Sequence, residues 1–391
     1  MMNPSAALLL ILAAAASCPS ARAFTVPSAS QNAMHRLGGQ RTNAFDRTTT
    51  PTCGTCCAGK VPITTSMALP ALPAAAVTAV TAATAAIQSA ILTGPHVLPV
   101  AGLTAISAAA VVPLTLIRQA YSFSVGYGAA VAAMCSALVG IFGLPSPLGR
   151  AAWYTAAGSS GGGGAGVLGG VTMAPAPQLL AYAGLIYGVR LASFLFLREV
   201  AVPSKREQIK KLDKTSRPAR VPFAAAVGMF YAFMVSPVLY AIRSGAALSC
   251  PFDVCTVATL GQVQWAGVIL AFFGLAVEAT ADTHKFLVKR DYDYATSFVG
   301  PTGGLYRMSR HPNYLGEILF WAGMFLGGIP AFGKNIVAWL AGSIGLWGIV
   351  SIMIGATKRL DEKQADRYES QLAYTTWRKK VKAPLFPFVN K

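Results

Sequence analysis

The segment 309–317, with the sequence SRHPNYLGE, holds two basic side chains, an amide, a phenol and a carboxylate around one proline. Proline is favoured in the first turn of a helix, because the N–H that it lacks would be unpaired there. A helix that begins at this proline has unbonded N–H groups in its first turn, and this positive end attracts an anion. Arg310 and His311 come just before that end, and Asn313 follows it. The segment therefore predicts a phosphate or carboxylate site at the start of a membrane helix.

Glu317 lies inside the apolar run that continues this segment to Phe332. Basic residues such as Arg310 often only anchor the end of a membrane helix at the interface. An anchor needs no carboxylate, however, and an ionisable group inside an apolar segment is costly and usually functional. Glu317 is one turn from Asn313 on the same helical face, so we expect both side chains to belong to the site.

A second polar stripe precedes this segment. Such a stripe needs no functional explanation if its residues simply form ion pairs one turn apart on a solvated helix end. That explanation suits the two lysines of the stripe better than Glu278, which lies well inside an apolar run. The stripe therefore predicts a second helix whose polar face meets the same membrane edge. Its members recur at helical spacing and are Glu278, Asp282, Lys285 and Lys289.

The composition predicts an all-α protein, a polytopic transmembrane helical bundle with seven or eight spans. Hydrophobic residues make up 54% of the 391 residues and charged residues only 12%, which is typical of membrane proteins. An Ala- and Thr-rich run over 69–93 is the weakest candidate span, because alanine contributes little to membrane insertion. The other runs of spanning length are 97–117, 121–143, 177–197, 222–242, 261–281, 315–332 and 335–357.

The net charge of +18 is concentrated on one side of the predicted bundle. Most of the Lys and Arg residues fall in three segments: eight in 198–220, five in 285–310 and nine in 358–391. If the chain crosses the membrane in each of the last five predicted spans, all three segments lie on the same side. The opposite side receives only Arg243 and Lys334, an asymmetry that follows the positive-inside rule. A basic face beside a membrane favours anionic membrane lipids or a polyanionic cofactor as ligands, and it argues against nucleic acid.

The N-terminal residues are typical of targeting segments rather than of the fold. Residues 1–23 have the apolar core and the Ala-Arg-Ala cleavage pattern of a signal peptide, although no Lys or Arg precedes the core. Residues 24–67 are rich in Ser and Thr and hold a single acid, as transit peptides do. With Phe24 directly after the cleavage pattern, the pair resembles the bipartite presequence of algae with secondary plastids. The alternative is a plain secretory signal before a disordered stretch, with the endoplasmic reticulum membrane as the location.

Two membrane regions follow this presequence. Residues 68–176 form an N-terminal transmembrane region, whose Gly-rich stretch 158–170 lacks the Lys-Ser/Thr ending of a phosphate-binding loop and is best explained as a linker. Residues 177–391 form the C-terminal membrane domain. No histidine accompanies the cysteine cluster at 53–57 with zinc-finger spacing, and we expect no metal site.

The two polar segments together resemble the C-terminal catalytic domain of the steroid 5-alpha-reductase-like membrane proteins. The matching stretches are EATADTHKF at 278–286 and GGLYRMSRHPNYLGE at 303–317, followed shortly by Trp-Ala-Gly. Tyr374, Trp377 and a closing Pro-Leu-Phe-Pro in the tail support the likeness. The resemblance covers residues 177–391 and is nearest to the poorly characterised bacterial, plant and algal branch of that family.

This resemblance implies an NADPH site on the basic face of an enzyme that reduces a carbon–carbon double bond in a hydrophobic lipid, isoprenoid or sterol-like substrate. Arg307 and Arg310 would bind phosphates with His311 beside them, and a basic cluster would suit the additional phosphate of NADPH. Asn313 would hydrogen-bond the nicotinamide amide. Glu317 matches the acid that follows the glycine of the family motif.

On the preceding helix, Asp282 and Lys289 match polar cofactor-binding positions of the family, with Lys285 beside them. Reduction of a double bond also needs a proton donor for the second carbon. Tyr314 and Glu278 are the candidates, since each is titratable and lies near the membrane edge. The family residues that polarise a 3-oxo group lie in the N-terminal half, where this chain has no match, and a steroid substrate is therefore not supported.

Two other classes of function stay open at this point. Isoprenylcysteine carboxyl and phospholipid methyltransferases, which use S-adenosylmethionine, also carry an Arg-His-Pro-x-Tyr-x-Gly segment and an acidic pair near the tail, which Asp361 and Glu362 resemble. Their pattern needs neither the upstream stripe nor the face formed by Asn313 and Glu317. A non-enzymatic lipid-binding membrane protein would need no polar stripe at all. The reductase is therefore the favoured hypothesis.

Overall fold

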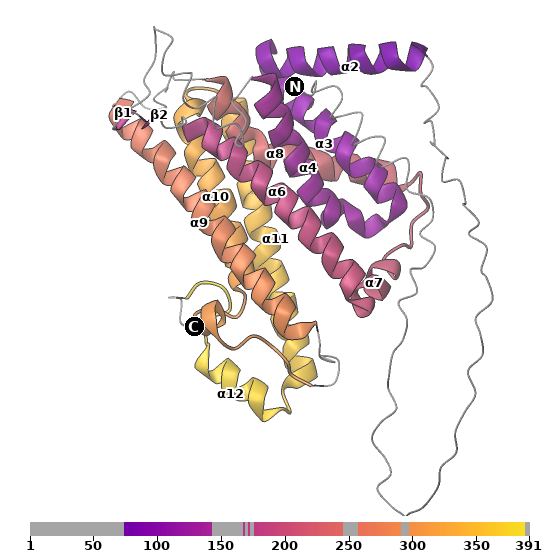
Figure 1. The fold of residues 1–391 in the computed structure, drawn as a ribbon, viewed down its shortest axis with the longest axis vertical. Coiled ribbons are helices and arrows are strands. Elements are labelled where there is room, and N and C mark those ends of the chain that lie inside the picture. The colour runs from indigo at the N-terminus through magenta and orange to yellow at the C-terminus, as the bar shows by residue number, and fades with distance from the viewer. Residues whose placement is uncertain are drawn as a thin grey trace, which may run out of the picture.

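The structure is a computed structural model that describes residues 74–142, 167–168, 171–172, 176–244, 257–290 and 297–387. These residues form a bundle of α-helices with two short 3-10 helices and one small antiparallel hairpin (Figure 1). The α-helices are α2 (Ala74–Thr93), α3 (Leu98–Ile117), α4 (Val125–Ile141), α6 (Ala176–Ala201), α7 (Pro203–Lys210), α8 (Arg220–Arg243), α9 (Val257–Lys289), α10 (Pro312–Phe332), α11 (Ile336–Tyr368) and α12 (Leu372–Lys380). The other elements are η1 (Gln119–Phe123), η2 (Gly304–Arg307), β1 (Val167–Leu168) and β2 (Val171–Thr172).

The prediction of an all-α transmembrane bundle is confirmed. Among the described residues, seven helices are long and apolar enough to cross a membrane, namely α2, α3, α6, α8, α9, α10 and α11. The apolar α4 is shorter, with 17 residues, and packs against α3, α6 and α8. The Ala-rich α2 packs on α3 and lies crosswise over one end of the bundle in Figure 1, with little of its surface buried. The presequence predicted over 1–67 lies outside the described residues.

The pairing of α9 with α10 brings the two polar segments of the sequence together. Glycines allow this close approach, since a Cβ atom placed on Gly316 of α10 would lie 2.5 Å from the backbone nitrogen of Glu278 on α9. A Cβ atom on Gly323 of α10 would likewise overlap the backbone of Ala271. Small residues are typical of helix contacts in membranes, where close packing rather than burial from water drives association. The first turn of α10 is therefore fixed against the polar stripe of α9.

Replacing Gly316 with leucine should force α9 and α10 apart and destabilise the fold by about 3 kcal/mol, because the backbone opposite cannot move as a flexible side chain can. Thermal unfolding of the purified protein in detergent would measure this loss as a lower Tm. Gly261→Leu is the matched control on α9, since a Cβ atom there meets nothing within 4 Å. Equal Tm values for the two variants would contradict the close packing of α9 on α10.

The basic segments collect at one end of the bundle. This end is the lower one in Figure 1. It holds the last residues of α6, α9 and α11 and the first residues of α8 and α10. The short helices α7 and α12 also lie toward it. The path of the helices agrees with the sidedness predicted from Lys and Arg. Asp213 lies between two arginines at this end, 3.7 Å from Arg118 and 3.3 Å from Arg220, and Glu199 lies 3.6 Å from Arg118. These ion pairs connect the turn after α3 to the end of α6 and the start of α8.

Candidate functional site

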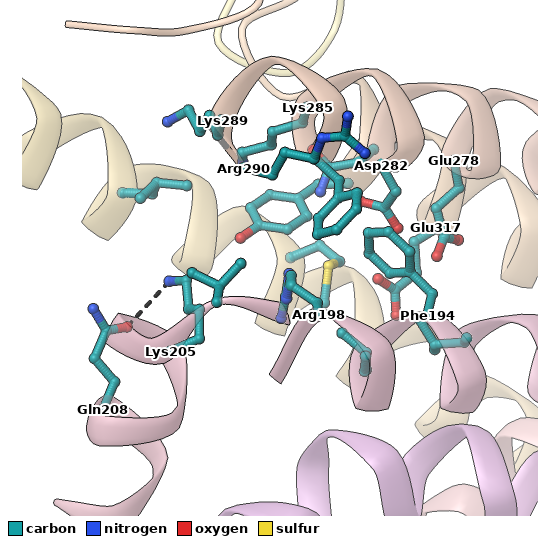
Figure 2. A pocket seen from close by; sticks show the side chains of 18 of the residues that line it. Phe194, Arg198, Lys205, Gln208, Glu278, Asp282, Lys285, Lys289, Arg290 and Glu317 are labelled. Carbon is teal, nitrogen blue, oxygen red and sulfur yellow. Dashed lines mark hydrogen bonds between the residues drawn. The ribbon is translucent and has the colours of Figure 1, made fainter. Parts of the chain in front are cut away.

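A cavity of 460 Å³ opens at the basic end of the bundle, among α6, α7, α9, α10 and α11 (Figure 2). Pockets of about 300–1,000 Å³ are usual for small molecules and cofactors. Apolar side chains form part of the wall, including Leu191, Phe194 and Met353. Polar and charged side chains of the α9 and α10 segments form much of the rest.

Cations surround the outer part of the cavity. Figure 2 shows those from the end of α9 facing those of α6 and α7 across the opening. Burial, together with the nearby cations Arg198 and Lys289, lowers the pKa of Lys205 to about 8. A bound polyanion would relieve such crowding of like charges. The cations that line the cavity are Arg198, Lys205, Lys285, Lys289, Arg290, Lys363 and Arg367.

Three carboxyl groups lie at the inner end of the cavity. Glu278, Asp282 and Glu317 are grouped together in Figure 2 and are 2%, 9% and 8% exposed. Arg190 of α6 binds two of them, with its guanidinium 2.5 Å from Glu278 and 3.4 Å from Asp282. One arginine thus faces three acids, and the cavity changes from basic at its mouth to acidic at its inner end.

A chain of hydrogen bonds leads from Glu317 into the apolar core. The Tyr127 hydroxyl of α4 donates to Oε1 of Glu317 at 3.0 Å, and Trp321 Nε1 donates to the same hydroxyl at 2.7 Å. The hydroxyl of Tyr187 lies 3.2 Å from that of Tyr127, and its ring stacks on Phe320 with centroids 4.0 Å apart. Tyr127 and Glu317 both line the cavity, so the rigid aromatic contacts fix one carboxyl at its inner end.

Among the described residues that line the cavity, two have a buried side-chain atom without a hydrogen-bond partner. These atoms are Oδ1 of Asn313 and Oε2 of Glu278. A buried polar atom without a partner is costly, and such atoms in native proteins call for an explanation such as a ligand or a water. Together they offer two hydrogen-bond acceptors to a bound molecule.

Seven of the ten residues predicted for the site line this cavity. They are Glu278, Asp282, Lys285, Lys289, Asn313, Tyr314 and Glu317. α10 begins at Pro312 as the sequence predicts, with His311 at its N-cap position. The first turn of α10 and the polar face of α9 are therefore parts of a single wall.

Arg307, Arg310 and His311 do not line the cavity, contrary to expectation. Arg310 points toward the C-terminal segment, where it binds Asp361 at 2.5 Å and the carbonyl oxygens of Val381 and Lys382 at 2.9 and 2.7 Å. His311 Nε2 lies 2.8 Å from Asp361. Burial lowers the pKa of His311, although its hydrogen bond to Asp361 opposes this shift. Arg307 is exposed on η2.

Replacing Arg310 with alanine should release the segment after α12 and cost about 3 kcal/mol, since it leaves Asp361 with His311 alone and two carbonyl groups without their partner. The expected result is faster tryptic cleavage between Arg378 and Lys382. Arg307→Ala, an exposed arginine of the same segment, is the control and should leave the cleavage rate unchanged. If Arg310→Ala kept the tail protected but weakened nucleotide binding, the phosphate role expected from the sequence would be restored.

Several residues that line the cavity or bind its carboxyl groups were not predicted from the sequence. Arg190 could have been found, because an arginine inside an apolar run is by itself a signal of function. Tyr127 carries no such signal, because it is one tyrosine in an apolar helix far from the motif. The missed cations are Arg198, Lys205, Arg290, Lys363 and Arg367, which the sequence gives only as members of basic segments.

The fold and the cavity define the class of this protein, a multi-pass helical membrane protein with a charged cavity open at its basic face. Residues 171–381, more than half of the chain, match the family described as "Protein of unknown function (DUF1295)", and the chain belongs to this family. The match includes every residue predicted for the site. No curated protein and no solved structure matches the chain.

Proposed function

We propose that the protein is a membrane-embedded oxidoreductase that binds NADPH in this cavity and reduces a carbon–carbon double bond of a hydrophobic lipid. The observation that carries the proposal is one cavity that joins seven cations at its mouth to three carboxyl groups at its inner end. A polyanionic nucleotide needs the cations, and protonation of a carbon needs an acid. The likeness to steroid 5-alpha-reductase-like proteins supports the same class of reaction, which acts on CH–CH groups.

The residues around the cavity fit NADPH. Lysine and arginine bind phosphates through charge-assisted hydrogen bonds, and here they come from α6, α7, α11 and the end of α9, on several sides of the opening. The buried Oδ1 of Asn313 can accept a hydrogen bond from the carboxamide of a nicotinamide ring. A ring held there would lie at the inner end of the cavity, beside Tyr314 and Glu317.

When bound, NADPH supplies a hydride to one carbon of the double bond and is oxidised to NADP⁺. The chain must supply a proton to the other carbon, so that the π bond is replaced by two C–H bonds. Glu317 is our choice of proton donor, because Tyr127 and the stacked aromatic rings behind it hold this carboxyl in one position. Tyr314 and Glu278 also line the cavity and are the alternatives.

A methyltransferase that uses S-adenosylmethionine is the second candidate, because three carboxyl groups at the inner end could accept its cationic sulfonium. Two observations favour the reductase. Seven cations at the mouth repel a cationic cofactor and attract a polyanion. Asp361, which resembles one of the tail acids of the methyltransferases, is bound to Arg310 and His311 outside the cavity.

The substrate that suits this cavity is a lipid, isoprenoid or sterol-like molecule that enters from the membrane, since apolar residues of α6 and α11 line part of the wall. The presequence-like residues 1–67 support a plastid membrane as its location. A fluorescent protein fused to the C-terminus of the chain would test this, and a reticular pattern would indicate the endoplasmic reticulum instead.

The reaction itself can be tested with NADPH that carries deuterium at the transferred position. Purified protein would be incubated with this cofactor and a lipid extract, and the products compared by mass spectrometry. We expect a lipid that gains one deuterium and one hydrogen where it had a double bond, and none of this product with Glu317→Gln. Transfer of a labelled methyl group from S-adenosylmethionine to a lipid, without deuterium transfer, would overturn the proposal.

Phosphate binding should weaken as the pH rises through about 8, because Lys205 loses its charge there. Its depressed pKa means that the attractive charge is fully present well below pH 8 and lost above it, and a bound phosphate moves this window upward. Titrations of NADPH affinity from pH 6.5 to about 9.5 would measure the effect. Lys205→Arg keeps its charge throughout and should make the profile less steep. An equally steep profile in that variant would assign the titration to another group.

A further inference from the structure

A smaller cavity of 190 Å³ adjoins the main one at the basic end of the bundle. Its walls come from η1, the start of α4, the end of α6 and α7. Five side chains line both cavities, and among them Lys205 and Gln208 are joined by a 3.1 Å hydrogen bond, visible in Figure 2. We call this space the side cavity.

Among the described residues, Glu199 is the one carboxylate that lines the side cavity. It is 5% exposed, and its Oε1 lies 3.6 Å from Nε of Arg118. Burial and the neighbouring Glu199 raise the pKa of Tyr121 to about 12, so a tyrosine hydroxyl lies near this carboxyl group. The other oxygen of Glu199, Oε2, is nevertheless buried and has no hydrogen-bond partner among the described residues. An unsatisfied buried carboxylate oxygen is strongly disfavoured, and a hydrogen-bond donor in the side cavity would remove this penalty.

The surroundings of Glu199 decide which donor fits. Arg198 and Lys205 line the same space and Arg118 lies behind the carboxylate, so a second ammonium group would meet three cations. A neutral hydroxyl avoids this repulsion, because it can donate to Glu199 and accept from Lys205 or Arg198. The chemistry of the side cavity therefore favours an alcohol over an amine.

Apolar side chains form the exposed part of the side cavity together with Gln208. Phe123 and Leu212 line it and are 53% and 47% exposed, and Ile209 and Val125 continue the apolar wall. At 190 Å³ the space is smaller than the usual range of drug-sized pockets, so it suits the end of a larger molecule better than the whole of one. An apolar chain leaving the cavity past Phe123 and Leu212 would be covered by these side chains.

We propose that the side cavity is a binding site for the hydroxyl end of a long-chain lipid alcohol, with Glu199 as the hydrogen-bond acceptor. This site needs no nucleotide and no turnover. Its existence is therefore independent of the reductase hypothesis, and each proposal can fail while the other stands. The alternative outcome is a space that holds only water, which a polar cavity of this size can also do.

The test uses the full chain, purified in detergent without nucleotide, and a long-chain primary alcohol that carries a photoreactive diazirine near its hydroxyl end. Cross-linked peptides would be identified by mass spectrometry. We expect labelling in the segments 120–125 and 209–212, and about tenfold weaker capture by Glu199→Gln, since a charge-assisted hydrogen bond becomes a neutral one. Glu207→Gln is the matched control, because Glu207 lies on α7 but outside both cavities, and it should leave capture unchanged.

Three results would overturn the proposal. They are equal capture of the matching hydrocarbon, stronger capture of the matching amine, and unchanged capture by Glu199→Gln. If Glu199→Gln fails to fold because it loses its ion pair with Arg118, Val125→Phe decides the matter. That variant narrows the side cavity and keeps the ion pair, so it should also lose most of the capture, and unchanged labelling would exclude the site.

Discussion

Replacing Lys285 and Lys289 together with alanine should weaken NADPH binding by about 100-fold or more. Each lysine lines the cavity on the same face of α9, and a hydrogen bond between a charged group and a phosphate contributes about 1.5–3 kcal/mol. The affinity of the purified variant in detergent, measured by calorimetric titration, would give the loss directly. It should also become less sensitive to salt, because fewer ionic contacts remain to be screened.

The control for this prediction is the double variant Lys379→Ala and Lys380→Ala. It removes the same charge from the exposed end of α12, on the same side of the bundle but away from the cavity. Its NADPH affinity should stay within about twofold of the original protein, because exposed charges at a distance are screened. Equal losses in both double variants would mean that the nucleotide responds to overall charge rather than to the cavity.

Glu317→Gln should lower the rate of double-bond reduction by about 10²–10⁴-fold. Tyr127→Phe should lower the same rate by about 10-fold or more. Both variants should leave the NADPH affinity nearly unchanged. Glutamine cannot give up a proton as a carboxylic acid does, and general acid catalysis contributes about 10²–10⁴ to a rate. Phenylalanine keeps the aromatic packing but removes the hydroxyl that donates to Glu317. Single-turnover measurements at saturating NADPH would separate this loss of rate from a loss of binding.

Tyr231→Phe is the matched control for the tyrosine variant. Tyr231 packs against Tyr127, with ring centroids 4.9 Å apart, but its hydroxyl donates to the carbonyl of Ser122 and does not reach Glu317. It should lower stability by about 1 kcal/mol and leave the rate of reduction unchanged. If Glu317→Gln retained the full rate, the proton would have to come from Tyr314 or Glu278 instead.

The sequence was sufficient to predict the elements that carry the site. Pro312 predicts the start of α10, and the spacing of Glu278, Asp282 and Lys285 predicts a polar face near the end of α9. The pairing of these helices through Gly316 then brings the two polar faces into one wall. Local sequence could predict this much, because each helix is defined by its own residues.

The direction of a side chain just outside a helix is not a local property. Arg310 comes immediately before the N-cap of α10, and the sequence around it is compatible with several orientations. Its direction is set by Asp361 and by the chain at Val381 and Lys382, which are 51 or more residues away in sequence. The tail therefore removes Arg310 from the site that its motif predicts.

The pairing of Tyr127 and Arg190 with the carboxyl groups of the site was likewise beyond the reach of motif reasoning. Tyr127 comes from α4, 190 residues before the Glu317 to which it donates. Arg190 comes from α6, 88 residues before Glu278. Their contribution depends on how α4 and α6 pack against α9 and α10, which the periodicity of an almost wholly apolar helix does not determine.

The central claim, that the charged cavity binds a nicotinamide dinucleotide, is tested most directly by equilibrium binding to the purified full chain in detergent. NADPH, NADH and S-adenosylmethionine would be titrated in turn under the same salt and pH. We predict that NADPH binds, that NADH binds about tenfold or more weakly because it lacks one phosphate, and that S-adenosylmethionine does not bind. Binding of S-adenosylmethionine without binding of NADPH would contradict this account and leave the methyltransferase in its place.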